Sequence, residues 1–314
     1  MAWAATTLQN SQANLGDALS PVLVSALSGL PTIHANFKSN QNRMAAIGTI
    51  AQDCVGGTIH FWGTGLNPNR SLGKKRRYRV PAGTTIKVHA MRGPLSSDVL
   101  QRQGIEVSGI YGDPVWFLPA IIPAAPEKCY ELGVIPHFFE LPDPSQASGA
   151  WMERYQVPRA MRDDVKQIST LTTPTFEGLE ALIRQITACK RIVSNSLHGM
   201  VIAEAYGIPC LHFAHGTNEA GQVTRMPMTL ANEAVNYRIR DFYGGVGVQR
   251  RFVYQQNRYQ RTRWRSLIKA IDQRWEPIEW KGDAFLEAFP LPLTFNPLAG
   301  VPFEQRSRFT HIRF

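Results

Sequence analysis

Apolar residues recur along this chain at two spacings, one typical of buried strands and one typical of helices, and segments of the two kinds alternate. Compact apolar runs predict buried strands, and in the first half they cover 44–50, 58–62 and 86–90. Apolar residues three and four apart predict helices over 19–27 and from Pro94 to position 100. The second half repeats this order, with a strand over 133–137, a helix over 176–186 and a strand at 192–193. This alternation predicts an α/β fold with parallel, doubly wound sheets in both halves.

Prolines predict where the chain divides. Three prolines fall between Pro119 and Pro126, and this stretch predicts a hinge between two domains. We therefore expect an N-terminal domain over 1–122, a C-terminal domain over 123–290 and a tail over 291–314 that docks in part. Ligands of doubly wound folds bind at the carboxyl ends of strands and between domains, so the cleft is the expected site.

The stretch from Arg191 to Pro209 is the most informative part of the chain. A buried strand ends near Val193, the polar turn 194–196 can cap a helix, and Gly207 with Pro209 ends that helix. His198 then falls in the first helical turn, beside unpaired backbone N–H groups and the positive end of the helix dipole. Anions bind at such a position, and a histidine there can exchange a proton near neutral pH. The unit predicts phosphate or carboxylate chemistry.

Composition narrows the class of protein. The chain has 314 residues, 44% of them hydrophobic, which is enough for a packed core. It contains no run of about 18 apolar residues, and its first residues lack the basic and apolar regions of a signal peptide. The four cysteines are scattered, without a CxxC pair. We expect a reduced, cytoplasmic protein with no structural zinc and no ligand cluster for a catalytic metal.

The net charge of +10 favours anionic partners, and the basic residues are clustered. One cluster lies in the loop-like stretch 70–79. The second runs over 250–274, where apolar residues at helical spacing from Trp264 to Ile271 predict an amphipathic helix. That helix either packs one face on the core in solvent or lies on an anionic membrane surface. Nucleic-acid binding is disfavoured, because stacking aromatic residues do not alternate with the basic ones in a strand pattern.

Several motifs together resemble the polysaccharide pyruvyl transferase family. The most specific is Ser194-Asn-Ser-Leu-His-Gly199, followed by Ala203-Glu-Ala-Tyr-Gly-Ile-Pro209. Asn14-Leu-Gly-Asp17, Met91-Arg-Gly-Pro-Leu-Ser96, Gly112-Asp-Pro114 and Ile135-Pro-His137 match other family segments in order. Asn236–Tyr243 and Phe285–Pro290 resemble the tail of members that pyruvylate xanthan-type exopolysaccharides. The resemblance covers most of residues 14 to 290.

The resemblance implies a GT-B-like fold of two Rossmann-type domains that face a central cleft. It also implies phosphoenolpyruvate as the donor, a sugar diol as the acceptor and a cyclic pyruvate ketal as the product, without a redox cofactor. The basic clusters fit a lipid-linked oligosaccharide acceptor at the inner face of the plasma membrane, where the protein would be peripheral. Two alternatives stay open at this point: a GT-B glycosyltransferase that uses a nucleotide sugar, and a regulatory family member without activity.

Three residues are the first candidates for the chemistry that the resemblance implies. We expect His198 to act as acid or base or to contact phosphate; otherwise it is a buried histidine bonded to a backbone carbonyl. We expect Arg92 to bind carboxylate or phosphate; otherwise it is a surface arginine. We expect Asp17 to orient the donor or deprotonate the acceptor; otherwise it caps the helix over 19–27.

The remaining candidates come from the same motifs. Ser194, Ser196, Leu197, Gly199 and His137 are expected to bind substrate. Many family members have arginine at the position of Ser196, although the exopolysaccharide branch often has serine. If that arginine holds phosphate elsewhere in the family, another basic residue must replace it here. His212 and His215 can line the acceptor pocket or be structural, and Asp113 is expected to anchor a turn through its side chain.

Overall fold

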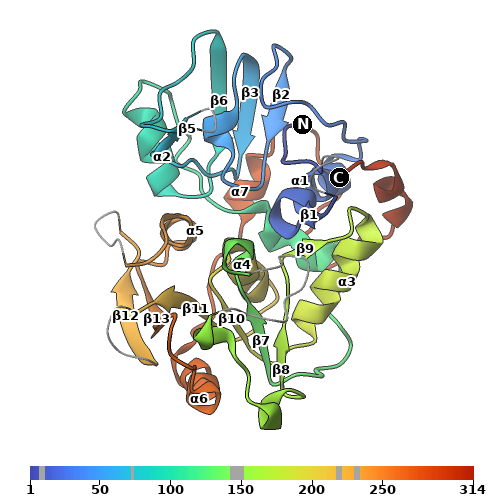
Figure 1. Ribbon diagram of the computed structural model, residues 1–314. Helices are drawn as coiled ribbons and strands as arrows, with labels where there is room; N and C mark the ends of the chain where they lie inside the picture. The colour runs from blue at the N-terminus through green and yellow to red at the C-terminus, as the bar shows by residue number, and fades with distance from the viewer. Residues whose placement is uncertain (7–10, 72–73, 142–151, 217–220, 230–233) are drawn as a thin grey trace.

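One parallel and one mostly parallel sheet form two lobes in the computed structural model, which describes residues 1–6, 11–71, 74–141, 152–216, 221–229 and 234–314 (Figure 1). The strands are β1 (Ala13–Asn14), β2 (Arg43–Ala45), β3 (Gly57–Trp62), β4 (Arg70–Ser71), β5 (Lys74–Lys75), β6 (Thr84–Ala90), β7 (Leu132–Ile135), β8 (Val165–Gln167), β9 (Leu171–Thr172), β10 (Ile192–Ser194), β11 (Cys210–His215), β12 (Gln222–Pro227) and β13 (Arg250–Gln256). The α-helices are α1 (Leu15–Ser28), α2 (Pro94–Gln101), α3 (Phe176–Thr187), α4 (Leu197–Ala205), α5 (Tyr237–Gly245), α6 (Trp264–Arg274) and α7 (Asp283–Glu287). The predicted α/β class is confirmed.

The N-terminal lobe contains a small parallel sheet in the order β2-β3-β6. The strand predicted over 44–50 is shorter than expected, since β2 ends at Ala45. Gly48 has a φ of +102°, which turns the backbone out of the extended conformation there. Beyond β6, Met91 forms a parallel bridge with Tyr111. The carboxyl ends of these strands therefore deliver the loops at 46–49, 63–69 and 91–93 to one edge of the sheet.

The C-terminal sheet has the order β12-β13-β11-β10-β7-β8, and only β12 is antiparallel to its neighbour among the described strands. From β7 the chain goes on to β8 on one side, and β10 lies on the other side. The gap between the ends of β7 and β10 is thus the point where the direction of winding changes, which is where ligands of open α/β sheets bind. His137 follows β7, and the turn before His198 follows β10.

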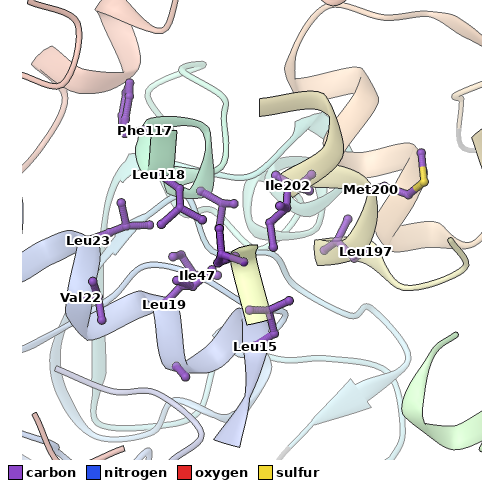
Figure 2. Packing of buried hydrophobic residues seen from close by; sticks show 14 of the residues in the cluster. Leu15, Leu19, Val22, Leu23, Ile47, Phe117, Leu118, Leu197, Met200 and Ile202 are labelled. Atoms are coloured by element: carbon purple, nitrogen blue, oxygen red, sulfur yellow. The ribbon is translucent and has the colours of Figure 1, made fainter. Parts of the chain in front are cut away.

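Helix α1 joins the two lobes through an apolar contact. The Asn14 side chain accepts a hydrogen bond from the Gly16 N–H at 3.2 Å, so Asn14 caps this helix. The alternative that Asp17 is the cap is therefore wrong. Leu15, Leu19 and Leu23 lie against the buried residues of α4 and of the 3-10 helix Pro114–Ala120 (Figure 2). This packing fixes the start of α1 next to the start of α4.

The stretch predicted as a hinge, Pro119 to Pro126, begins in the core and then reaches the surface, where Pro123, Ala124 and Pro126 are exposed. Leu118, Ile121 and Ile122 are fully buried, because apolar residues surround the prolines and pack on the helix α4. The C-terminal residues also return to the first lobe: Phe285 of α7 stacks on Trp62 of β3, with ring centroids 4.7 Å apart. Phe309 packs on Phe176 of α3 at 4.5 Å, so the tail docks as predicted and closes the core.

Helix α6 packs one face on the core of the second lobe. Trp264, Leu267 and Ile271 are buried there, which is the first of the two outcomes expected for this basic amphipathic segment. None of the helices in the described part of the chain is both long and apolar enough to cross a bilayer.

Candidate active site

The turn after β10 places His198 at the winding change of the larger sheet. The Ser194 hydroxyl donates to the Ile135 carbonyl at 2.8 Å and accepts the Ser196 N–H at 3.0 Å, which ties β10 to β7 and shapes the turn. A Cβ atom on Gly199 would lie 2.4 Å from that hydroxyl, so α4 can approach the turn only with glycine there. Leu197 is buried in the core, and Ser196 occupies the cap position without a side-chain cap bond.

These contacts show what four of the predicted substrate-binding residues do within the protein. Ser194 and Gly199 build the turn, and Leu197 anchors it in the apolar core. Ser196 is 7% exposed and precedes His198 by two residues. Direct contact of any of them with a substrate stays a prediction.

His198 lies between the two lobes with its ring against the start of α1. A Cβ atom on Gly16 would lie 1.8 Å from the Nδ1 atom of His198, so only glycine leaves room for the ring. The Nε2 atom points to the other side, 3.9 Å from the Oδ2 atom of Asp113. That distance is too long for a hydrogen bond. Nε2 of His198 and Oδ2 of Asp113 are both buried and have no hydrogen-bond partner among the described residues.

An unpaired buried polar atom is costly in a folded protein, and such atoms often mark a functional site. The alternative that His198 is satisfied by a backbone carbonyl is therefore not supported at its Nε2 atom. Burial, and next the charges of Arg92 and Arg238, lower the pKa of His198 to about 3. The imidazole is consequently neutral at physiological pH until an anion offsets those charges.

Two carboxyl groups face the same region from the first lobe. Asp113 caps the 3-10 helix Pro114–Ala120 by accepting the Val115 N–H at 3.0 Å, as the sequence predicted. Burial raises the pKa of Asp113 to about 6, although the Val115 hydrogen bond and the charge of Arg92 act against that rise. Burial likewise raises the pKa of Asp17 to about 6, and the charge of Arg238 partly opposes the shift. Both groups can therefore gain or lose a proton close to neutral pH.

Arg92 is fully buried, so the surface-arginine alternative is wrong. Its Nε and Nη2 atoms lie 3.1 and 2.9 Å from Oδ2 of Asp241 in α5, and its Nη1 atom donates to the Thr49 hydroxyl at 2.7 Å. A Cβ atom on Gly65 would lie 2.2 Å from the guanidinium carbon, which shows how closely the backbone covers this group. Arg92 thus joins the two lobes by an ion pair and places a positive charge near His198.

Arg238, at the start of α5, is a second cation at this site. Its charge lowers the pKa of His198 and of His137 and opposes the rise at Asp17, so it lies within electrostatic reach of all three. Burial, and next the charge of Arg92, lower its own pKa. In contrast to Arg92, its guanidinium has no hydrogen bond or close ion pair to the described residues. Arg238 is therefore free to meet an anion.

His137 lies beside this group at the end of β7. Its N–H donates to the Asn195 side chain at 2.6 Å, and its Nδ1 atom accepts the Phe139 N–H at 3.3 Å. Burial, and next the charge of Arg238, lower the pKa of His137 to about 4. The structure thus brings His137 to the cleft as predicted from the sequence.

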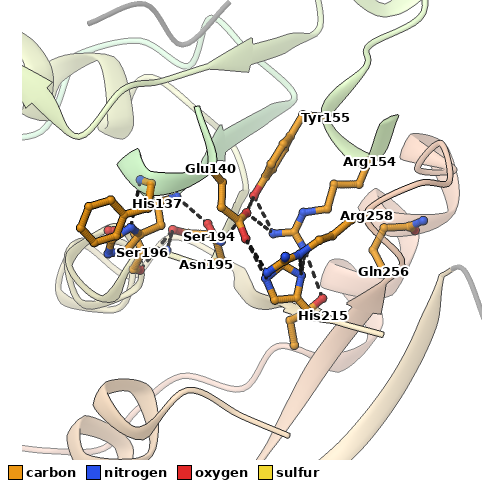
Figure 3. A network of polar contacts seen from close by, with 12 residues as sticks. His137, Glu140, Arg154, Tyr155, Ser194, Asn195, Ser196, His215, Gln256 and Arg258 are labelled. Carbon is orange, nitrogen blue, oxygen red and sulfur yellow. Dashed lines mark hydrogen bonds and ion pairs between the residues drawn. The ribbon is translucent and has the colours of Figure 1, made fainter. Parts of the chain in front are cut away.

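A second polar group surrounds Glu140 at the other end of the cleft (Figure 3). Glu140 accepts from Arg154 at 2.8 Å, Asn195 at 2.7 Å and the Tyr155 hydroxyl, and its Oε1 lies 2.7 Å from Nε2 of His215. Burial alone would raise the pKa of Glu140, but the hydrogen bond from His215, the charge of Arg154 and the hydrogen bond from Tyr155 together lower it to about 2. This network holds the β7 and β11 loops in place.

A cavity of about 870 Å³ lies beside these two groups, although His198, Asp17 and Asp113 are not among its lining residues. His137 and Arg238 line one end of it, and Glu140, His215 and Arg258 line the other. Asn67 and Asn69 of the first lobe also contribute, so both lobes form its wall. His212 lines the cavity too, but its Nδ1 atom is 3.0 Å from the Ser194 carbonyl, which indicates a structural role for the ring. The described residues form no cluster of three or more side chains suited to hold a metal ion.

Sequence reasoning missed Arg238 and underrated Asp113. Arg238 belongs to the Asn236–Tyr243 segment, which drew notice only as a part of a family tail, although the need for a basic residue in place of the arginine missing at Ser196 was a signal. Asp113 was predicted only as a turn anchor, because its second oxygen meets His198 through a contact that no sequence spacing reveals. The Glu140 network joins four separate segments and left no local pattern.

The fold and this site define an α/β protein that holds a neutral histidine, two carboxyl groups and two cations at a winding change, an arrangement suited to acid–base chemistry on an anion. A family model described as polysaccharide pyruvyl transferase matches residues 55–217. That span is more than half of the chain and includes Arg92, Asp113 and His198. The chain belongs to the polysaccharide pyruvyl transferase family.

The chain also resembles one curated protein, whose description names no function. The chain is 30% identical over 125 residues to an uncharacterized protein of Acanthamoeba polyphaga mimivirus. The alignment covers 38% of this chain and 39% of that protein, so the chain spans well under half of the length of this relative. No solved structure matches the chain.

Proposed function

We propose that this enzyme transfers the pyruvyl group of phosphoenolpyruvate to two hydroxyls of a sugar and releases phosphate, leaving a cyclic pyruvate ketal. Family membership supports polysaccharide pyruvyl transfer, and the donor and product are our proposal. The observation that carries it is the pair of unpaired buried atoms, Nε2 of His198 and Oδ2 of Asp113, beside the charges of Arg92 and Arg238. A trianionic donor with one carbon to protonate suits such a site.

The donor carries a phosphate and a carboxylate, and both need cationic partners. Arg238 is the cation without a close partner, so it is the group that we expect to bind one of them. Backbone N–H groups at the start of α4 favour the other anionic group. Arg92 acts on the donor through its charge and not through direct contact, because its guanidinium is already bound to Asp241 and Thr49. Arg238 thus takes the place of the arginine that many family members have at the position of Ser196.

Bound phosphoenolpyruvate changes the protonation of His198. Its negative charges offset those of Arg92 and Arg238, which lower the pKa of the free imidazole, so the ring gains a proton when the donor binds. The Asp113 carboxylate at 3.9 Å stabilises the resulting imidazolium. His198 is then the general acid that delivers a proton to the terminal methylene carbon of the donor, which becomes the methyl group.

Asp17 is the proposed base. Its carboxylate takes the proton of the first sugar hydroxyl as that oxygen attacks the central carbon of the donor. The second hydroxyl then displaces phosphate and closes the ketal. In the sum of these steps one hydroxyl hydrogen ends on the methyl group and the other on phosphate, so no further reactant is needed. Gly16 supports this division of roles, because the His198 ring packs on it and Asp17 is the next residue in the first turn of α1.

The acceptor that we propose is a lipid-linked oligosaccharide repeat unit at the inner face of the plasma membrane, with the protein peripheral in the cytoplasm. The two lobes around a cavity are consistent with a GT-B-like arrangement of Rossmann-type domains, which we retain as a proposal. Exposed basic residues of the β4–β5 hairpin support an anionic acceptor or surface, because in the described part of the chain they form no ion pair. They are Arg70, Lys74, Lys75, Arg76, Arg77 and Arg79.

Incubation of the enzyme with phosphoenolpyruvate and a set of oligosaccharide acceptors tests this function. We expect inorganic phosphate to be released in proportion to a product one pyruvate ketal heavier than the acceptor, and Arg238→Gln to weaken donor binding. The exposed Arg265→Gln is the matched control and should leave donor binding unchanged. Glycosyl transfer from a nucleotide sugar without any ketal product would disprove the proposal and identify a glycosyltransferase.

A further inference from the structure

One aromatic side chain on the cavity wall has no role in the scheme above. Phe139 is 76% exposed, yet it lies between His137, which faces the donor end, and Glu140, which faces the second network. Single exposed apolar residues are common on protein surfaces and need no explanation. The position of Phe139 is different, because the ring lines the cavity that contains the proposed donor site.

The backbone that carries Phe139 is held from both sides. The His137 N–H binds Asn195 at 2.6 Å, the Phe139 N–H binds His137 at 3.3 Å, and the Glu140 carboxylate is fixed by the network around Arg154. The rings of His137 and Phe138 lie 5.1 and 4.1 Å from the Phe139 ring. The turn therefore presents an exposed aromatic surface on a fixed base, which is what a binding platform requires.

Two neutral amides line the same cavity as this surface. Asn67 and Asn236 line the same cavity, and their side-chain oxygens are used in local turns by the N–H groups of Asn69 and Arg238. Their amide nitrogens remain as donors at the cavity wall. Uncharged donors suit hydroxyl groups better than they suit phosphate or carboxylate, for which the guanidinium of Arg238 is available.

We infer that Phe139 is the platform for the acceptor sugar, which places its apolar ring face on the phenyl group while its hydroxyls bind the Asn67 and Asn236 amides. An aromatic ring buries apolar C–H surface, and the amides replace water at the hydroxyls. The inference rests on the proposed function for the reason that a sugar should lie here. It adds the residue that determines how tightly a hexose unit binds and which way it faces.

The probes for this inference are methyl β-D-glucoside, methyl β-D-galactoside and methyl β-D-mannoside, observed by saturation-transfer NMR on the full chain. We expect at least one to bind the wild type and Phe139→Ala to weaken it by about tenfold, the scale of one aromatic contact. Phe139→Trp, which keeps an aromatic face, should retain binding. Tyr259→Ala removes an aromatic ring that is 80% exposed but not part of the cavity wall, and it should have no effect.

Calorimetric titration with phosphoenolpyruvate separates this inference from the proposed function. Phe139→Ala should bind the donor like the wild type, because the donor site lies at Arg238. Glycoside binding that survives Phe139→Ala, or that is missing for all three glycosides in the wild type, overturns the platform. Glycoside binding that depends on Phe139 in a protein that does not bind phosphoenolpyruvate would support the platform and refute the proposed donor instead.

Discussion

The two ends of the cleft differ in how well their buried polar atoms are satisfied. At the Glu140 end, each carboxylate oxygen has a partner, and burial is compensated by hydrogen bonds from Arg154, Asn195 and Tyr155 and by His215. At the His198 end, Nε2 of the ring and Oδ2 of Asp113 face each other at 3.9 Å without a partner among the described residues. Both ends contain buried titratable groups, but only at the Glu140 end does the carboxylate have a partner at each oxygen, although Nε of Arg154 is unpaired there among the described residues.

This difference suggests that the Glu140 end stabilises the fold and that the His198 end carries the chemistry. A satisfied network lowers the free energy of the folded state and fixes loops, whereas unsatisfied groups raise it unless a ligand compensates. The pKa values agree with this distinction. That of Glu140 is lowered to about 2, so it stays ionised, whereas those of Asp17 and Asp113 are raised to about 6, where a proton can move. Variants at the His198 end should therefore lower turnover, whereas variants at the Glu140 end should lower the free energy of unfolding.

His198→Ala should have the largest effect, and it should fall on turnover. Loss of one general acid or base typically lowers the rate by about 10² to 10⁴. The ring makes no hydrogen bond at Nε2 and lies against a glycine, so the free energy of unfolding should change little. Phosphate release and thermal unfolding measure the two quantities. The exposed His311→Ala is the control. A variant that unfolds but keeps normal activity in its folded fraction would make His198 structural.

Glu140→Gln should lower the stability of the fold and leave turnover of the folded enzyme nearly unchanged. The substitution keeps the shape of the side chain but leaves the buried Arg154 charge unpaired, and breaking such a pair costs about 3 to 5 kcal/mol. We expect a clear fall in the unfolding midpoint, measured by denaturant titration, with kcat of the folded enzyme within a few-fold of the wild type. Glu153→Gln, which breaks an exposed pair with Arg261, is the matched control and should cost less than about 1 kcal/mol.

The pH dependence of stability also tests the structural role of Glu140. The pKa of Glu140 is lowered in the folded state from 4.5 to about 2, so its stabilisation is complete above the unfolded value and is lost as the pH falls toward 2. Glu140→Gln should remove this part of the acid dependence. A variant with unchanged stability and much lower kcat would instead place Glu140 in the chemistry and remove the distinction between the two ends.

Local patterns carried much of the fold and some of the site. The period of the apolar residues predicted α3 and α6, and the polar turn before α4 placed His198 correctly, because each depends on neighbours in sequence. The stretch 119–126 was predicted as a hinge because its prolines dominate the local signal, while the burial of Ile121 and Ile122 depends on long-range contacts. Arg238 and the oxygen of Asp113 reach the site only through packing between lobes, which periodicity does not describe.

The pH dependence of catalysis should identify the base at the His198 end. Burial raises the pKa of Asp17 to about 6, so its carboxylate form prevails above that pH and is lost below it. We expect kcat/KM to fall about tenfold per pH unit below 6. Asp17→Asn should lower activity and abolish this fall, whereas the exposed Asp283→Asn should keep both. If Asp113→Asn removes the fall and Asp17→Asn does not, the base is the carboxyl group that faces His198.

The smallest effect on the chemistry should come from basic surfaces outside both ends of the cleft. Helix α6 buries Trp264, Leu267 and Ile271, so its exposed basic face can meet an anionic bilayer without unfolding. Each basic residue near such a surface contributes about 1 kcal/mol. We expect the wild type to float with vesicles that contain acidic lipid, less so as salt increases, and charge reversal at Arg263 and Arg265 to abolish this.

Turnover of a soluble acceptor should be unchanged in that variant, because the cleft holds the chemistry. The same reversal at Arg76 and Arg77 of the β4–β5 hairpin tests the other basic surface. If only the hairpin variant loses vesicle binding, the membrane face is the one beside Asn67 and Asn69, and a lipid-linked acceptor would enter the cavity from the first lobe. If the α6 variant loses soluble turnover as well, the helix supports the satisfied network at the Glu140 end, which α6 reaches through the contact of Trp264 with Phe213. Wild-type protein that ignores acidic vesicles would remove membrane attachment from the proposal and leave the chemistry at His198 untouched.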